Sequence, residues 1–152
     1  MQRGALYSYD EWRNNANYRR MLLKDHSLSQ FEIPSLGLFS WSLSDNRLVA
    51  DETYAAIYGL DPSRLAAGMD IESIISLIAD EDREDAARRT HATILSGELD
   101  TIAFAIKRGP RIIRVGAFGR CLRDETGTPS IFTGVVFELS ANTAGWFSRV
   151  RQ

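Results

Sequence analysis

Residues 114 to 140, RVGAFGRCLRDETGTPSIFTGVVFELS, decide the fold of this 152-residue chain. Val, Ile, Phe and Thr, which favour β-strands, occupy both ends of the stretch, and a polar run from Asp124 to Thr128 separates them. Asp124 is a common turn residue, and Gly127 can adopt a positive φ at no steric cost. The stretch therefore predicts two long antiparallel strands joined by a single turn.

Upstream of this hairpin, the hydrophobic pattern predicts two strands followed by four helices. Residues 38 to 43 alternate, so Phe39, Trp41 and Leu43 share one face of the first strand, and a short strand is expected at 48 to 50. Three short helices follow, the third over residues 71 to 78, and a longer fourth helix ends at Gly97. The residues expected to cap these helices are Asp51, Asp61, Asp70 and Asp80.

Beyond Gly97 the period returns to two, with one strand around residues 102 to 106 and another around 113 to 117. An amphipathic helix over residues 9 to 24 precedes the whole arrangement. Consecutive strands with tight turns favour an antiparallel sheet, and the helices between the second and third strands would cover one face of it. We therefore predict an α+β fold with a five-stranded antiparallel sheet, helices on one face and an N-terminal amphipathic helix.

Composition predicts one soluble domain, with 44% hydrophobic and 25% charged residues. Cys121 is the single cysteine, so no intrachain disulfide can form and a reducing, cytoplasmic location is expected. No apolar run approaches the roughly 20 residues of a membrane span, and no signal peptide is recognisable. The net charge of −2, without a basic surface interleaved with aromatics, argues against a nucleic-acid partner.

Together with the hairpin, two upstream motifs carry a family resemblance: GLFSWSL at residues 37 to 43 and YGLDPS at 58 to 63. They resemble the PAS family of sensory and dimerisation domains, in the bacterial sub-type whose first strand has a Gly-x-aromatic-x-Trp pattern. The resemblance covers residues 37 to 140. It departs from the family at residues 78 to 83, where a His-Pro pair is missing, and at residues 108 to 111, where RGPR replaces an Asp-Gly turn.

The resemblance implies three segments. Residues 1–36 would be an N-terminal helix and linker for dimerisation or capping, residues 37–140 the PAS domain, and residues 141–152 a C-terminal linker or the start of a signalling helix. It also implies a cavity between the concave sheet face, including Leu43, and the helices. The ligand-binding candidates are Phe39, Trp41, Tyr54, Ile57, Tyr58, Ile78, Ile94, Val115, Ala117, Phe132 and Val136. Alternatively, these side chains simply fill the core, as aromatics at strand period often do.

The opposite sheet face is predicted to be too apolar for free contact with water, because it would carry Phe118, Val135 and Phe137. The N-terminal helix, from the same chain or from a second copy, is the expected cover, and a homodimer follows. Its docking residues would be Trp12, Tyr18, Leu22 and Leu23.

No cofactor or metal site is predicted beyond an unknown small molecule. The light-sensing PAS branch requires cysteine in an Asn-Cys-Arg helix motif, whereas Cys121 lies on a predicted strand, and Val136 stands in place of the flavin-contacting glutamine. Haem-binding PAS kinases ligate iron through a histidine on the long helix, but His91 lies only six residues before Gly97. The family pattern instead turns Ala86, Thr90 and Ile94 inward.

The resemblance implies a non-enzymatic, cytoplasmic sensory module that couples binding of a small ligand or a partner to an output domain, such as a two-component histidine kinase. Alternatives are a ligand-free interaction module, a haem sensor and a small enzyme similar to ketosteroid isomerase. The enzyme would recruit Asp70 or Asp100 with Tyr54 or Tyr58. Those enzymes begin with helices, however, and both carboxylates fall at caps and turns, so no catalytic residue is predicted.

Overall fold

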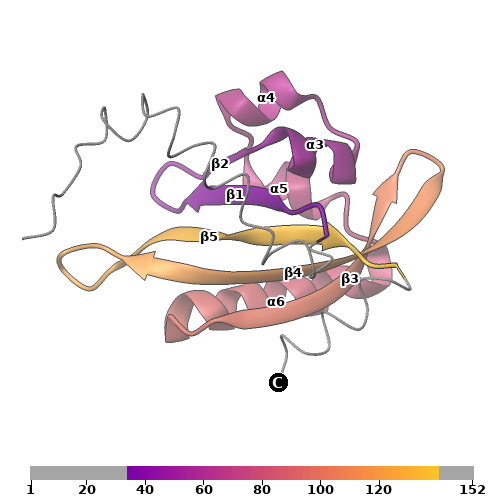
Figure 1. The fold of residues 1–152 in the computed structure, drawn as a ribbon. Helices are drawn as coiled ribbons and strands as arrows, with labels where there is room; N and C mark the ends of the chain where they lie inside the picture. Colours follow the sequence, from indigo (N-terminus) through magenta and orange to yellow (C-terminus); the bar gives the residue numbers. More distant parts are fainter. Residues whose placement is uncertain (1–33, 141–152) are drawn as a thin grey trace, which may run out of the picture. The chain divides into compact units, whose positions relative to one another are not determined.

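A five-stranded antiparallel sheet organises residues 34 to 140, the part of the chain that the computed structural model describes (Figure 1). The strands lie in the order β2-β1-β5-β4-β3. Their bounds are β1 Gly37–Ser42, β2 Arg47–Ala50, β3 Asp100–Arg108, β4 Arg111–Arg123 and β5 Pro129–Glu138. The predicted α+β fold with its five-stranded sheet is confirmed. The predicted helix over residues 9 to 24, with Trp12, Tyr18, Leu22 and Leu23, lies outside the described residues, as does the segment from 141 to 152.

The hairpin predicted from residues 114 to 140 forms between β4 and β5, with Gly119 opposite Gly134. Asp124 builds the turn, because its Oδ1 accepts hydrogen bonds from the backbone N–H groups of Thr126 at 2.9 Å and Thr128 at 3.0 Å. Gly127 has a φ of 81°, which a residue with a side chain rarely adopts. The local turn chemistry therefore sets this register.

Four helices connect β2 to β3: α3 Glu52–Tyr58, α4 Pro62–Ala67, α5 Ile71–Ile75 and α6 Asp80–Ser96. Asp51, Asp61 and Asp70 cap the first three, each accepting a hydrogen bond from a backbone N–H of the first turn. The predicted cap of α6 is wrong: Ala79 is the capping residue, and no side chain caps the helix. Asp80 instead accepts a hydrogen bond from Arg83 at 2.7 Å.

The third short helix ends at Ile75, earlier than the predicted residue 78, because the next residues pair with the edge of β3. The N–H of Lys107 donates to the carbonyl of Leu77 at 2.7 Å, and the N–H of Ala79 donates to the carbonyl of Ala105 at 2.9 Å. A helical conformation would have taken these groups away from the sheet. This pairing fixes the start of α6 against the sheet.

Each edge strand of the sheet also forms hydrogen bonds with residues outside the sheet. Leu48 on β2 exchanges two hydrogen bonds with Met69, at 2.7 and 2.8 Å. On β3, the carboxylate of Asp82 accepts the N–H of Ala105 at 2.7 Å, and Arg89 donates to the carbonyl of Thr101 at 2.7 Å.

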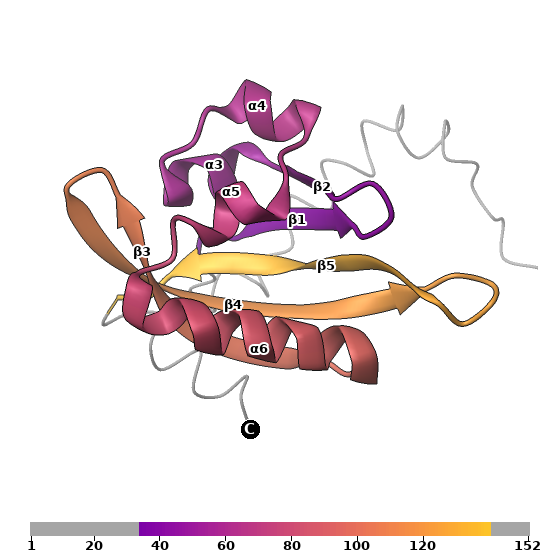
Figure 2. The same ribbon diagram turned by 180° about the vertical axis from the view of Figure 1, so that it is seen from behind.

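The helices lie over one face of the sheet, as the view from behind shows (Figure 2). The side chains between these two layers form the main core, and its largest fully buried members are Leu48, Leu65, Ile106, Val115 and Val136. No helix among the described residues is long and apolar enough to span a membrane.

Candidate ligand cavity

A cavity of about 440 Å³ lies between the concave face of the sheet and the helices. All five strands contribute to its floor, and α3, α5 and α6 form its walls. Its volume falls within the roughly 300 to 1,000 Å³ that is typical of small-molecule sites. Several apolar side chains along it are only partly buried, including Trp41, Ile75 and Ile94, so the cavity communicates with solvent.

Nine of the eleven candidate residues line this cavity. They are Phe39, Trp41, Tyr54, Tyr58, Ile78, Ile94, Ala117, Phe132 and Val136. Ile57 and Val115 do not line it; they are 6% and 0% exposed and belong to the solid core beside it. Leu43 lies beyond the end of β1, where its N–H bonds the carbonyl of Ser130 at 3.0 Å. Their roles in binding remain predictions.

Five aromatic rings follow one another along the lining of the cavity. Ring centroids are 6.4 Å apart between Trp41 and Phe132, 5.9 Å between Phe132 and Phe39, and 5.7 Å between Phe39 and Tyr54. Tyr54 stacks on Tyr58 at 4.5 Å with an interplanar angle of 14°. The period of β1 and the i, i+4 spacing on α3 bring these rings to one side, which we call the aromatic row.

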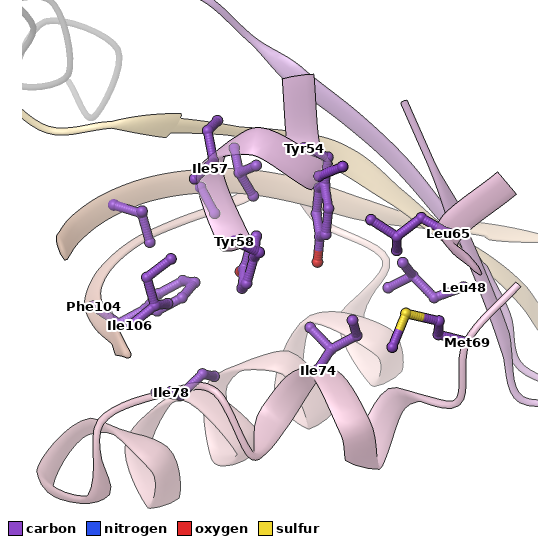
Figure 3. Close-up of a cluster of buried hydrophobic side chains, with 14 of the residues drawn as sticks. Leu48, Tyr54, Ile57, Tyr58, Leu65, Met69, Ile74, Ile78, Phe104 and Ile106 are labelled. Atoms are coloured by element: carbon purple, nitrogen blue, oxygen red, sulfur yellow. The ribbon is translucent and has the colours of Figure 1, made fainter. Parts of the chain in front are cut away.

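The two tyrosines place polar groups in an otherwise apolar region. Tyr54 and Tyr58 are 2% and 4% exposed, and Figure 3 shows the Tyr54 hydroxyl pointing into the space between α3 and Ile74. Burial raises the pKa of both hydroxyls well above the usual value, and for Tyr54 the neighbouring Tyr58 raises the pKa further. Both groups are therefore neutral hydrogen-bond donors at physiological pH.

A hydrogen-bond network that local sequence patterns do not reveal holds Trp41 in place. Its indole Nε1 donates to Oδ1 of Asn46 at 2.9 Å, and the same oxygen accepts the N–H of Ile71 at 3.2 Å. The amide nitrogen of Asn46 donates to Glu72 at 2.8 Å. Asn46 has a φ of 49°, a left-handed conformation that asparagine tolerates. Nothing in the sequence connects Asn46 to Trp41.

Polar residues from α6 and β3 form another part of the cavity wall. Arg89 forms an ion pair with Asp100 at 2.8 Å. These two opposite charges in the described lining therefore neutralise each other. Ala86, Thr90 and Ile94 face the cavity as the family pattern implied, whereas His91 is exposed at its rim. Arg89 could not be recognised as a lining residue from the sequence, because its partner Asp100 is on another element.

The carboxylates considered for an enzyme already have partners. Asp100 pairs with Arg89, and Asp70 accepts hydrogen bonds from the backbone and side chain of Ser73 at 2.9 Å. Cys121 is a buried thiol, 3% exposed. Within the described residues, no group of three or more His, Cys, Asp or Glu side chains is placed to hold a metal ion.

On the opposite sheet face, Phe137 is fully buried and its ring lies 6.4 Å from that of Phe118, while Val135 is partly exposed. Phe118 also borders the cavity, next to the small residues Ala117 and Gly119 of the same strand. The docking of the N-terminal helix on this face remains a prediction.

No protein-family model matches the sequence, and no curated protein matches it. Solved structures do resemble the fold. The N-terminal domain of a diguanylate cyclase with a PAS/PAC sensor from Marinobacter aquaeolei has a TM-score of 0.62 at 12% identity, covering 68% of this chain and 94% of that one. A sensory box histidine kinase/response regulator from Burkholderia thailandensis has a TM-score of 0.61 at 16% identity, covering 86% and 93%.

A third similar structure is the PAS-B domain of Drosophila melanogaster Cycle, in a W398A variant with bound glycerol. It has a TM-score of 0.56 at 10% identity and covers 68% of this chain and 99% of that one. These proteins share the sheet and its helical layer with the present chain, although their sequences are very different. The described residues therefore adopt the PAS fold.

Proposed function

We propose that this chain is a non-enzymatic sensory module whose internal cavity binds a small organic molecule and whose occupancy controls an output partner, such as a histidine kinase. The cavity of about 440 Å³ is the observation that carries this proposal. A core without function would be expected to close most of this volume, because protein interiors pack to a density near 0.75. The same fold occurs in a diguanylate cyclase with a PAS/PAC sensor and in a sensory box histidine kinase/response regulator, which supports a sensory role.

The cavity is connected to elements that can transmit occupancy. Trp41 lies in its wall and is bound to Asn46, which in turn bonds both Ile71 and Glu72 at the start of α5. A guest that displaces the indole therefore disturbs a turn, a strand and a helix together. Only a guest that binds two arrangements of these elements unequally can shift their populations.

Assembly is part of the same proposal. A homodimer would form through the sheet face on which the partly exposed Val135 lies, with Trp12, Tyr18, Leu22 and Leu23 contributing from the N-terminal segment. Light scattering on the full chain should show a dimer, and Val135→Glu should shift the mass toward the monomer. A monomeric wild-type chain would contradict the dimer without affecting the cavity.

Binding is tested by comparing the full chain with Ala117→Phe, which fills the cavity from its floor. Native mass spectrometry and an absorption scan of the freshly purified protein should show a guest that Ala117→Phe lacks. If no guest co-purifies, a thermal-shift screen of small organic molecules should find one that stabilises the wild type. At a concentration of 100 times its Kd, such a molecule raises the free energy of unfolding by about 2.7 kcal/mol. A molecule library that raises the melting temperature of neither protein, or of both equally, refutes ligand sensing.

A further inference from the structure

The cavity combines two buried hydroxyls with a lining that offers little to a charged molecule. Among the described residues, none besides the two tyrosines themselves hydrogen-bonds to the hydroxyls of Tyr54 and Tyr58. Two hydroxyls that share one hydrogen bond keep one donor and further lone pairs for a guest. A guest oxygen placed between α3 and Ile74 would lie next to the Tyr54 hydroxyl and its Tyr58 partner (Figure 3).

The arginine and the aspartate that line the cavity form an ion pair with each other. Arg89 uses Nη2 for both Asp100, at 2.8 Å, and the carbonyl of Thr101, at 2.7 Å. His91 is exposed at the rim, where water surrounds it. No uncompensated charge from the described lining residues therefore reaches the buried part beside the tyrosines.

We propose that the guest is an uncharged, ring-containing molecule with a carbonyl or hydroxyl oxygen, and that the paired hydroxyls of Tyr54 and Tyr58 bind this oxygen. This inference rests on the proposed ligand-sensing function and specifies its chemistry. The aromatic row supplies ring edges and faces from Trp41 to Tyr58, against which a planar guest can pack.

Size and charge support the same class of guest. The cavity of about 440 Å³ would hold roughly 15 water-sized groups at about 30 Å³ each, which suits two fused rings with one substituent. Burying an isolated carboxylate is costly unless a partner compensates the charge. The burial that raises the pKa of both tyrosines also disfavours an anionic guest at the same place.

Three naphthalenes with a substituent at the same ring position test the inference: acetylnaphthalene, ethylnaphthalene and naphthoate. The first has a neutral acceptor, the second has none, and the third is an anion. Calorimetric titration of the full chain should rank their affinities as acetyl first, ethyl second and naphthoate last. Ala117→Phe should abolish binding of all three.

Tyrosine variants separate the hydrogen bond from shape. Tyr58→Phe and Tyr54→Phe should each lower the affinity for acetylnaphthalene by roughly threefold to tenfold, which is the effect of losing one neutral hydrogen bond. Neither should change the affinity for ethylnaphthalene by more than about twofold. Ser40→Ala is the matched control, because it removes a hydroxyl from the other face of β1, where Ser40 bonds Thr133 at 3.1 Å.

The outcomes distinguish the two proposals. If none of the three naphthalenes binds, but other molecules stabilise the wild type and not Ala117→Phe, the function holds and the proposed guest chemistry is wrong. Naphthoate binding as tightly as acetylnaphthalene, or equal loss of the acetyl and ethyl compounds in the tyrosine variants, also refutes the chemistry alone. If no molecule of any kind binds in a manner that depends on Ala117, both proposals fail.

Discussion

Gly37, at the start of β1, offers the sharpest test of how the cavity wall is built. A Cβ at this position would lie 2.7 Å from Cα of Tyr54, 2.8 Å from its backbone nitrogen and 3.0 Å from its Cβ. Ordinary contacts of a Cβ begin at 3.4 Å. Because the atoms struck belong mainly to the backbone of α3, no change of rotamer relieves the overlap. Gly37→Ala must therefore displace the helix that carries Tyr54 and Tyr58.

The expected magnitude follows from two opposing effects. Overpacking of this kind costs about 1 to 3 kcal/mol, and the upper end applies because the backbone must move. Alanine also restricts the unfolded chain, which stabilises by about 0.4 to 1 kcal/mol where the native φ is acceptable, as it is at Gly37. We expect Gly37→Ala to lower the free energy of unfolding by about 2 kcal/mol, a large share of the roughly 5 to 15 kcal/mol of a typical domain.

Guanidinium titration followed by circular dichroism measures this change. Gly127→Ala is the control, because nothing lies within 4 Å of its Cβ position and only the positive φ of 81° penalises it. We expect about 1 kcal/mol there. The reasoning is refuted if Gly37→Ala is as stable as the wild type, or if Gly127→Ala is the more damaging of the two.

Three further predictions concern single side chains. Asn46→Gly keeps the left-handed backbone available but removes the acceptor of the Trp41 indole, so NMR should show faster exchange of that N–H and a loss of about 1 kcal/mol; unchanged exchange contradicts the network. Hydrogen bonds from Ser73 lower the pKa of Asp70 in the folded state, so stability is gained above the unfolded value of 3.8 and lost as the pH falls through the folded value. Asp70→Asn, which still caps α5, should reduce this acid dependence of the denaturation midpoint; an identical acid profile would argue against the shift. Burial raises the pKa of Tyr58 in the folded state. The free energy of unfolding is therefore unaffected by the ionisation of this group below the unfolded pKa of 10.0, and it falls as the pH rises beyond that value. Tyr58→Phe should flatten the alkaline loss of stability, and a profile that is just as steep would contradict the prediction.

Features encoded by neighbouring residues could be predicted from the sequence. The alternation in β1, the Asp caps of α3, α4 and α5, and the Asp124 turn each depend on residues within about four positions. The family motifs added the arrangement of these elements, because local signals alone do not determine which strands are neighbours.

Features formed by distant residues could not be predicted in this way. The early end of α5 depends on Leu77 bonding Lys107, and the support of β3 depends on Asp82, which is 23 residues from Ala105. Periodicity places Val115 on the same sheet face as Ala117, yet only Ala117 lines the cavity. Depth within a core depends on which helix lies above each side chain, and a one-dimensional pattern does not contain that information.

The closed edges of the sheet restrict how this protein can associate. A strand with free N–H and C=O groups recruits strands from other chains and can seed cross-β aggregates. Here Met69 covers part of β2, and residues 77 to 79 with Asp82 and Arg89 cover part of β3. Growth of the sheet into a continuous ribbon across protomers would first require breaking those bonds. At these covered positions, recognition by another protein has to use side chains, which are easier to tune toward one partner than a backbone ladder that accepts almost any extended peptide.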